Sequence, residues 1–315
     1  HFVRRRQRQM CIRDSIWGDL EQDTYRRDFT VNALYYCPIS QKIVGHKDGM
    51  KHIHEKSIVS IGDPVKRFSE DPVRSLRAIR FSNKLNFKID KDIKEAIYEK
   101  GHLLSDISNA RLFDEFCKIF LSGMAEKNFN KLSSYGLSKY LISTDSERSE
   151  FTRNLIVESL RNTDKRLMND QSITPGFLIA ALLWPGLIER SLSKGEINLR
   201  KFFRSMDYVL RNQQKITAVP RKFQSYIKDI WVLQLKLHSR IGKQPYKTLK
   251  HPRFRAAYDL LLLREKAANE KQGLGKWWTD FQKNDENIKK ALIDDLREKN
   301  IQESPKIFGF SEELR

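Results

Sequence analysis

The chain has 315 residues, of which 39% are hydrophobic and 31% charged, with 14 glycines and 9 prolines. This composition excludes an intrinsically disordered chain and favours one or two globular, mainly helical domains. The formal net charge is +19, from 59 Lys and Arg against 40 Asp and Glu. Such an excess predicts a polyanionic partner, because basic side chains release counterions from phosphates. Nucleic acid is favoured over an acidic protein.

Targeting signals and cysteines point to the cytoplasm. No apolar run reaches the roughly 20 residues that span a bilayer, and the first residues lack the apolar core of a secretion signal. Cys11, Cys37 and Cys117 lie far apart, without the spacing of a zinc site. An odd and sparse cysteine count fits a reducing compartment. We therefore expect a cytoplasmic protein without a membrane span.

The N-terminal region is predicted to hold a leader and a β-hairpin. Residues 1–14 carry five arginines with little periodicity, and we interpret them as a fragment end or artefact rather than as a nucleic-acid-binding arm. Residues 28–36 are rich in Phe, Thr, Val and Tyr, which predicts a strand, and 42–49 predict a second one ending in a turn at Asp48–Gly49. A two-stranded hairpin alone is only marginally stable.

From residue 64 onward the pattern is helical. Asp71 and Pro72 are typical of a helix start, and Val73, Leu76 and Ile79 repeat every three residues. A second amphipathic helix is predicted over 109–123, with its apolar stripe at Leu112, Phe116, Ile119 and Phe120. Further helices are predicted near 151–162, 176–184, 198–212, 222–239, 254–269 and 286–298, with linkers near 144–150 and 163–175.

A charged segment opens the first predicted strand. Arg26 and Arg27 stand where guanidinium groups could clamp triphosphate oxygens, and Asp28 could orient one of them. Asn32 could reach a ribose hydroxyl from the same strand face as Asp28 and Thr30, because the three have even spacing. The alternative is a solvated strand edge with protective charge, and the segment taken alone favours that alternative.

A second charged segment begins the first predicted helix. Asp71, Arg74 and Arg77 are spaced by three residues, so neighbouring members can share a helix face. A carboxylate accepts from an exocyclic amine, and an arginine donates to a ring nitrogen or carbonyl, so Asp71 and Arg74 could read the edge of a nucleotide base. The alternative is an ordinary ion pair with a helix cap, worth less than about 1 kcal/mol.

Together the segments resemble a known superfamily. RRDFTVNA (26–33), the Asp48–Gly49 turn and EDPVRSLRAIRF (70–81) follow one another as in the class II nucleotidyltransferases, which include tRNA CCA-adding enzymes and bacterial poly(A) polymerases. The resemblance implies that the first motif binds ribose and phosphates, that the turn is a hinge and that the third motif recognises the base. The implied nucleotide-binding residues are Arg26, Arg27, Asp28, Asn32, Asp71 and Arg74, supported by Glu70 and Arg77.

The C-terminal half favours one branch of that superfamily. The stretches 219–237, 251–264 and 276–282 resemble the body and tail of proteobacterial poly(A) polymerases, which CCA-adding enzymes usually lack. The resemblance therefore implies addition of AMP from ATP to RNA 3′ ends with Mg²⁺. RNA, ATP and proteins of RNA decay are the implied partners. The ARLFDEFCKIF stretch (110–120) resembles a neck helix in which Arg111 and Glu115 would be structural.

The resemblance also predicts a defect. In the family a glycine-rich loop and an Asp-x-Asp pair that holds two Mg²⁺ ions precede the RRDFT motif. The only Asp-x-Asp of this chain is Asp90–Lys91–Asp92, which is typical of a helix start. Phosphoryl transfer depends on such metal-binding carboxylates. We therefore expect no catalytic or metal-binding residues in this chain and no activity of the chain alone.

The expected fold is mainly α, with a multi-helical neck and body and a small β-hairpin remnant of an α+β nucleotidyltransferase head. The expected segments are a leader unrelated to the family (1–14), the head remnant (15–60), the neck (61–125) and a basic RNA-binding body (126–315). A CCA-adding enzyme and a non-catalytic RNA-binding module are the two alternatives.

Three further features have mostly structural interpretations. Trp277 and Trp278 could stack on RNA bases, but packing is favoured because aromatic residues dominate core burial. His46, His52 and His54 match no standard metal spacing and are expected at the surface. The basic residues between 189 and 255 are dense enough to form an RNA track, and the net charge favours this over a solvated face.

Overall fold

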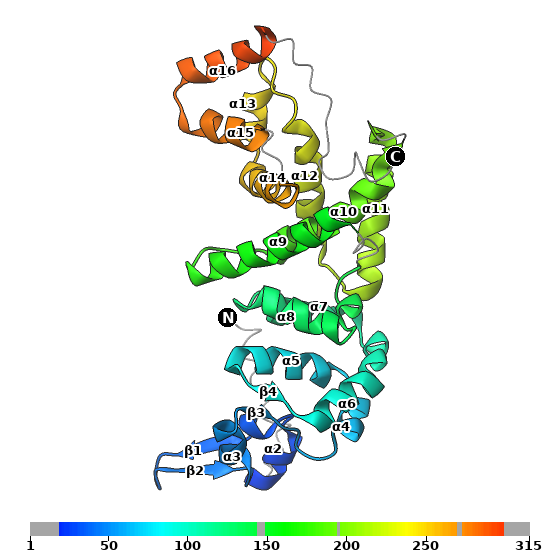
Figure 1. Cartoon of the computed structure of the whole chain (residues 1–315), viewed down its shortest axis with the longest axis vertical. Helices are drawn as coiled ribbons and strands as arrows, with labels where there is room; N and C mark the ends of the chain where they lie inside the picture. Colours follow the sequence, from blue (N-terminus) through cyan, green and yellow to red (C-terminus); the bar gives the residue numbers. More distant parts are fainter. Residues whose placement is uncertain (1–18, 144–148, 194–195, 270–272, 299–315) are drawn as a thin grey trace, which may run out of the picture. The chain divides into compact units, whose positions relative to one another are not determined.

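The computed structural model describes residues 19–143, 149–193, 196–269 and 273–298, so the predicted leader at 1–14 lies outside the described residues. The chain divides into two compact units, with the boundary between Leu104 and Ser105. Fifteen α-helices and six short strands make up the described part, which confirms the mainly helical prediction. No helix in these ranges is long and apolar enough to cross a membrane. Figure 1 shows the elements.

Unit 1, described from residue 19, begins with helix α2 (Leu20–Arg26) and an antiparallel hairpin of β1 (Leu34–Cys37) and β2 (Lys42–Gly45) (Figure 1). Gly45 ends β2 at the open end of the hairpin with φ of 134°, and a Cβ there would lie 2.2 Å from the carbonyl oxygen of Ala33. Only glycine can hold this conformation at such close approach. All four residues of β2 are exposed, so the hairpin adds little to the core.

The predicted strand over 28–36 is wrong in its first half. Phe29 is fully buried and forms a bridge with Ser60, and residues Thr30–Asn32 then turn into a 3₁₀ helix (η1) before β1 begins. The turn follows the burial of Phe29, and it removes the alternation on which the shared face of Asp28, Thr30 and Asn32 depended. The three side chains therefore do not line one strand face.

The remainder of unit 1 is a small helical core. Pro64 stands in the first turn of α4 (Pro64–Glu70), and the Asp63 carboxylate accepts from the Val65 N–H. The predicted stripe of Val73, Leu76 and Ile79 on α5 (Val73–Leu85) is buried, which confirms it. Short helix α3 (Gly49–His54), helix α6 (Lys91–Lys100), the 3₁₀ helix η2 (Gly101–Asp106) and the parallel pair β3 (Ser57–Ile58) and β4 (Lys88–Ile89) complete it.

Unit 2 is built around a central helix. Helix α10 (Pro175–Ser191) is buried along nearly its whole length and packs against α9 (Glu150–Met168), α11 (Leu199–Ile216) and α12 (Arg221–Lys236). The helices predicted in this half all form, but the linker predicted at 163–175 is partly wrong, because α9 continues to Met168. The other elements are α7 (Asn109–Phe120), α8 (Ala125–Ser134), η3 (Ser138–Tyr140), β5 (Leu192–Ser193), β6 (Glu196–Ile197), α13 (Gln244–Leu249), α14 (Phe254–Ala267), α15 (Leu274–Lys283) and α16 (Glu286–Glu298).

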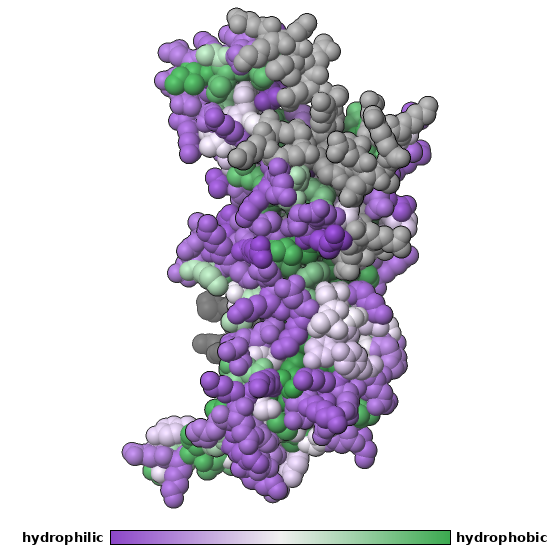
Figure 2. All heavy atoms as spheres, viewed as in Figure 1, coloured by the Kyte–Doolittle hydropathy of each residue, from purple (hydrophilic) through white to green (hydrophobic). Residues whose placement is uncertain are grey.

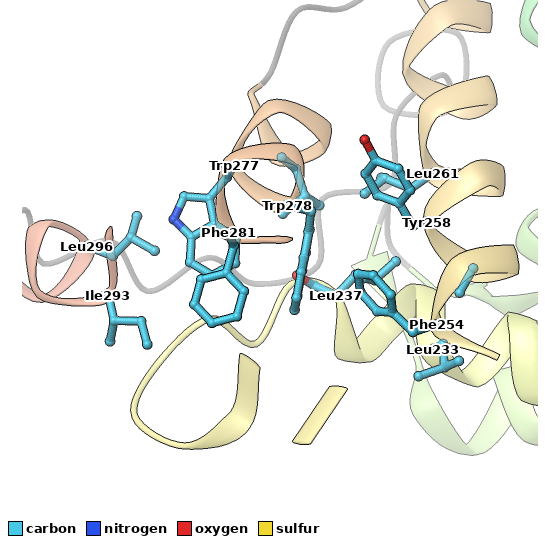
Figure 3. Close-up of a cluster of buried hydrophobic side chains, with 12 residues drawn as sticks. Leu233, Leu237, Phe254, Tyr258, Leu261, Trp277, Trp278, Phe281, Ile293 and Leu296 are labelled. Atoms are coloured by element: carbon cyan, nitrogen blue, oxygen red, sulfur yellow. The ribbon is translucent and has the colours of Figure 1, made fainter. Parts of the chain in front are cut away.

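Aromatic packing holds the last helices of unit 2 together (Figure 3). Trp278 is fully buried, its Nε1 donates to the Leu237 carbonyl at 2.9 Å, and its ring lies across from Phe254 and Phe281. Trp277 stacks on Phe281 with a centroid distance of 4.8 Å. The prediction that the two tryptophans pack rather than stack on RNA is confirmed, because buried rings have no free face for a base.

A buried arginine in unit 2 has no signature in the sequence. Arg264 on α14 is 0% exposed, its Nη1 donates to Gln234 Oε1 at 2.8 Å, and its Cζ lies 4.5 Å from the centre of the Trp184 ring. Burial lowers the pKa of Arg264 to about 10. Burial, with Arg264 and Arg240 nearby, also lowers the pKa of His238 to about 3. The buried Arg264 guanidinium is therefore held by an amide and an aromatic ring.

Candidate nucleotide site in unit 1

The buried carboxylate of Asp28 joins the two charged motifs. Its Oδ1 accepts from Arg74 Nε at 3.0 Å, and its Oδ2 lies 2.7 Å from Arg77 Nε. The second contact is an ion pair without the alignment of a hydrogen bond. The Asp28 side chain is 7% exposed and that of Arg74 12%. Asp28 and Arg74 thus meet although they lie 46 positions apart. In the sequence they belong to separate motifs.

The Asp28 backbone is fixed as well. Its carbonyl accepts from the Ile61 N–H at 3.2 Å, and the Thr30 N–H donates to the Val59 carbonyl at 3.0 Å. The segment before η1 is thereby held against residues 59–61. The Asp28 carboxylate therefore stands on a fixed backbone when it meets α5.

Arg74 is anchored through two of its three guanidinium nitrogens. Nη1 donates to the Arg67 carbonyl at 2.7 Å and to Glu70 Oε2 at 3.1 Å, while Nε contacts Asp28. The hydrogen bond from Arg74, aided by the charge of Arg67, lowers the pKa of Glu70. Within the described residues Nη2 has no hydrogen-bond partner. This nitrogen is the part of Arg74 that remains able to donate to a ligand.

Arg67, which the sequence reasoning missed, ties α4 to the end of α2. Its Nη2 donates to the carbonyls of Arg27 at 2.8 Å and Tyr25 at 3.2 Å, and its Nη1 pairs with Glu70 at 3.1 Å. Its position three residues before Glu70 and seven before Arg74 was the available signal. The prediction began the helix at Asp71, which left Arg67 outside it.

Arg26 and Arg27 lie exposed at the C-terminal end of α2. Arg27 pairs with Asp23 at 2.9 Å, and the Tyr35 hydroxyl donates to the same carboxylate. The Tyr35 hydrogen bond, followed by that of Arg27, lowers the pKa of Asp23, and the bond to Asp23 raises the pKa of Arg27. Asp28 therefore contacts Arg74 and Arg77 rather than the neighbouring arginines, and the Arg27 guanidinium pairs with Asp23 instead.

The other predicted residues lie around this network in different settings. Asn32 is partly buried and is the last residue of η1, and Asp71 Oδ1 accepts from the Val73 N–H at 3.2 Å at the start of α5. Asp48 occupies the N-cap position of α3, whose first residue, Gly49, is buried. The structure thus brings Asp28, Glu70, Arg74 and Arg77 into direct contact.

The histidines lie near the hairpin without forming a metal site. The Asp48 N–H donates to His46 Nδ1 at 3.2 Å, and the Thr30 hydroxyl lies 2.9 Å from His52 Nδ1. His54 is exposed, as predicted, and His46 and His52 are partly buried. In the described ranges no group of three or more His, Cys, Asp or Glu is placed to hold a metal ion.

The Asp-x-Asp pair confirms its interpretation as a helix start. The Asp90 carboxylate accepts from the Asp92 N–H at 3.0 Å and occupies the N-cap position of α6. The Asp90 carboxylate is therefore engaged in starting the helix, and Asp92 stands in its first turn. The described residues do not provide a set of ligands that fits the Mg²⁺ ions implied by the resemblance.

Three sequence-family models match the chain. Residues 2–59 match "Poly A polymerase head domain", residues 86–144 match "Probable RNA and SrmB- binding site of polymerase A", and residues 194–306 match "Polymerase A arginine-rich C-terminus". The helix α5 with its charged motif lies between the first two matched stretches.

Curated relatives agree with these matches. Poly(A) polymerase I of Salmonella typhi is 37% identical over 305 residues, which is 93% of this chain and 65% of the relative. Poly(A) polymerase I of Haemophilus influenzae is 39% identical over 295 residues, 90% of this chain and 65% of the relative. A CCA-adding enzyme of Lactococcus lactis is 28% identical over 249 residues, 79% of this chain and 56% of the relative. The chain spans about two thirds of the length of the first two relatives.

Solved structures share the fold. A tRNA nucleotidyltransferase complexed with a primer tRNA and an incoming ATP analog superposes with a TM-score of 0.58 at 19% identity, covering 91% of this chain and 76% of that one. At this identity the likeness concerns the fold alone.

Proposed function

Since this chain belongs to the poly(A) polymerase I family of class II nucleotidyltransferases, we propose that it serves the template-independent addition of AMP from ATP to RNA 3′ ends. The observation that carries the proposal is the contact of Asp28 with both Arg74 and Arg77. It unites the ribose–phosphate motif and the base-recognition motif in one network. Neither motif alone outweighed its structural alternative, and their contact favours a shared ligand.

The proposed role of each side chain follows from its exposure and from the donors and acceptors that it has not used within the protein. Arg26 and Arg27 are exposed and basic, so they would contact the triphosphate. Asn32, at the end of η1, would contact the ribose. Arg74 would donate from Nη2 to the base while Asp28 and Glu70 hold its other nitrogens. A donor fixed in this way loses little side-chain entropy on binding.

Asp71 is the proposed second base-reading group. It would accept from the exocyclic amine of adenine, one helical turn from Arg74. Cytosine also carries an exocyclic amine, so the choice of ATP over CTP would depend on the placement of the two groups relative to each other. Asp48 and Gly49 would act as a hinge at the start of α3.

RNA binding is proposed for the neck and body. The net charge of +19 and the descriptions of the family models matched at 86–144 and 194–306 support it. Hydrophilic residues predominate on the face of the molecule that Figure 2 shows. The description of the family model matched at 86–144 also supports a protein partner there. The cytoplasm is the proposed compartment.

Nucleotide preference tests the base-reading proposal. Binding of ATP and of CTP to the 315-residue chain is compared between the wild type and Arg74→Ala, by titration calorimetry. We expect ATP affinity to fall by about tenfold or more and the preference for ATP to shrink, because one charge-assisted hydrogen bond is lost. Lys84→Ala, an exposed basic residue on the same helix, is the control. An unchanged ATP preference in Arg74→Ala would refute the role.

Activity assays separate the alternatives. Incorporation of AMP into RNA, and of CMP and AMP into tRNA that lacks its CCA end, are measured with this chain and with a complete relative. Repair of the tRNA end by the relative would favour the CCA-adding alternative. From the sequence we expect the chain alone to bind RNA without incorporating AMP, and incorporation by the chain alone would contradict the expected lack of catalytic carboxylates.

A further inference from the structure

A pocket in unit 2 brings residues of the stretch 251–264 together with residues of helix α9, a contact that no motif of the sequence indicated. Its volume is about 200 Å³, several times the roughly 30 Å³ that one water takes in the liquid. Helix α9, the loop before α10, α12 and the start of α14 form its walls. The side chains used below are Arg166, Thr174, Tyr226, Arg253, Arg255 and Asp259.

One carboxylate organises two of the three arginines. Asp259 Oδ2 lies 3.1 Å from Arg166 Nη1, and Oδ1 lies 3.1 Å from Arg255 Nε. Arg166 also donates to the Ser172 carbonyl at 3.4 Å, which fixes it to the loop. Asp259 thereby holds Arg255 by its Nε, and the terminal nitrogens of Arg255 have no partner within the described residues. A guanidinium held at one end is well placed to bind a ligand with the other.

The third arginine is held by an aromatic ring. The Arg253 Cζ lies 4.8 Å from the centre of the Tyr226 ring, and within the described part of the chain its guanidinium has no carboxylate partner. Tyr226 itself is fixed, because Gly176 in the first turn of α10 faces it so closely that a Cβ would come within 2.9 Å of the ring. The stack leaves the N–H edge of Arg253 open at the pocket.

The charge balance of the pocket favours an anion. Three guanidinium groups face a single carboxylate. Among the described residues, the lining contains no other acidic or basic side chain. The lining also includes Thr174, the N-cap of the 17-residue helix α10, so the positive end of that helix adds to the field. Guanidinium forks match the oxygens of a phosphate group.

We propose that this pocket binds a phosphodiester of single-stranded RNA, with Arg253 and Arg255 as its direct contacts and Asp259 as the residue that positions Arg255. The proposal rests on the proposed function, in which RNA is the substrate and therefore the expected polyanion. It places an RNA contact outside the stretch 86–144 that matches a description of RNA binding. Arg166 lies outside all three matched stretches, whereas Arg253 and Arg255 lie in the third.

The test measures binding of a short single-stranded oligoribonucleotide to the 315-residue chain over a series of salt concentrations. Arg253→Ala and Arg255→Ala are compared with Lys42→Ala, which removes the same charge from an exposed position on β2, outside the stretches proposed to bind RNA. We expect each pocket variant to lose about tenfold in affinity. Because a phosphate contact is lost, the slope of log K against log salt should also become shallower by about 0.7.

The outcomes separate this proposal from the proposed function. If the wild type binds RNA but the pocket variants match Lys42→Ala, the pocket proposal is wrong while RNA binding stands. If the wild type does not bind RNA at all, both are wrong. Inorganic phosphate and AMP serve as competitors, and displacement of RNA from the wild type by either at concentrations typical of a specific site would show a pocket for a free phosphate instead. Unfolding midpoints show whether each variant is folded.

Discussion

In unit 1, carboxylates hold the arginines that face the candidate site, whereas in unit 2 the most buried arginine is held by an aromatic ring and an amide. Arg74 contacts Asp28 and Glu70, while Arg264 contacts Trp184 and Gln234. In Arg74 the Nε and Nη1 nitrogens are held by acceptors, and Nη2 is left to donate. A ring-held guanidinium in the core is desolvated, and its pKa falls to about 10. The same residue type is thus a proposed ligand-binding group in unit 1 and a core residue in unit 2.

The units also differ in how they are stabilised. Unit 2 buries most of helix α10 and the aromatic cluster of Figure 3. Unit 1 combines a smaller apolar stripe on α5 with the Asp28 network and an exposed hairpin. We therefore expect losses of apolar packing to cost most in unit 2, losses of charge to cost most in unit 1, and changes in the hairpin to cost least.

The largest effect is expected from Trp278→Ala. It removes a fully buried ring and leaves a cavity, which should lower the free energy of unfolding by about 3–5 kcal/mol. Urea unfolding followed by circular dichroism measures the loss, and Lys276→Ala, exposed on the same helix, should be nearly neutral. A loss below about 1 kcal/mol would show that the cluster contributes little to unit 2.

A smaller effect is expected from Asp28→Asn. The buried Arg74 then loses its carboxylate partner, which should cost about 2–3 kcal/mol, mostly from Arg74 because Arg77 is partly exposed. Hydrogen exchange of the α5 amides reports on unit 1 alone and should become faster. Asp23→Asn, which breaks the exposed pair with Arg27, is the matched control and should change α5 exchange less. Equal effects of the two substitutions on α5 exchange would show that the contacts of Asp28 with Arg74 and Arg77 contribute no more than the exposed pair.

The smallest effect is expected in the hairpin. Ile43 on β2 is 54% exposed, so Ile43→Thr should change the free energy of unfolding by no more than about 0.5 kcal/mol. In the wild type, the amides of β1 and β2 should exchange faster than those of α5, because a hairpin with one exposed strand opens locally at little cost. Protection of the hairpin equal to that of α5 would contradict the contrast between the two parts of unit 1.

The sequence predicted helices better than the site. The spacing of Val73, Leu76 and Ile79 and the cap at Asp90 depend on neighbours within four residues, and both predictions are confirmed. The strand at 28–36 failed at its start because the burial of Phe29 against distant residues overrode local alternation. From the sequence, Asp28 was paired with the neighbouring arginines because local spacing does not show contacts with distant residues. Its true partners lie 46 and more positions away.

The sequence by itself determined the family resemblance, the places where the predicted helices begin, and the basic charge that predicts a polyanionic partner. Only the tertiary structure decided that Asp28 meets Arg74 and Arg77, that Arg264 lies in the core, and that Arg253 and Arg255 face one pocket. Periodicity and capping act over one or two helical turns and are legible in a single stretch of sequence. The pairing of charges across helices depends on which surfaces pack together, and that is fixed by burial of the whole unit.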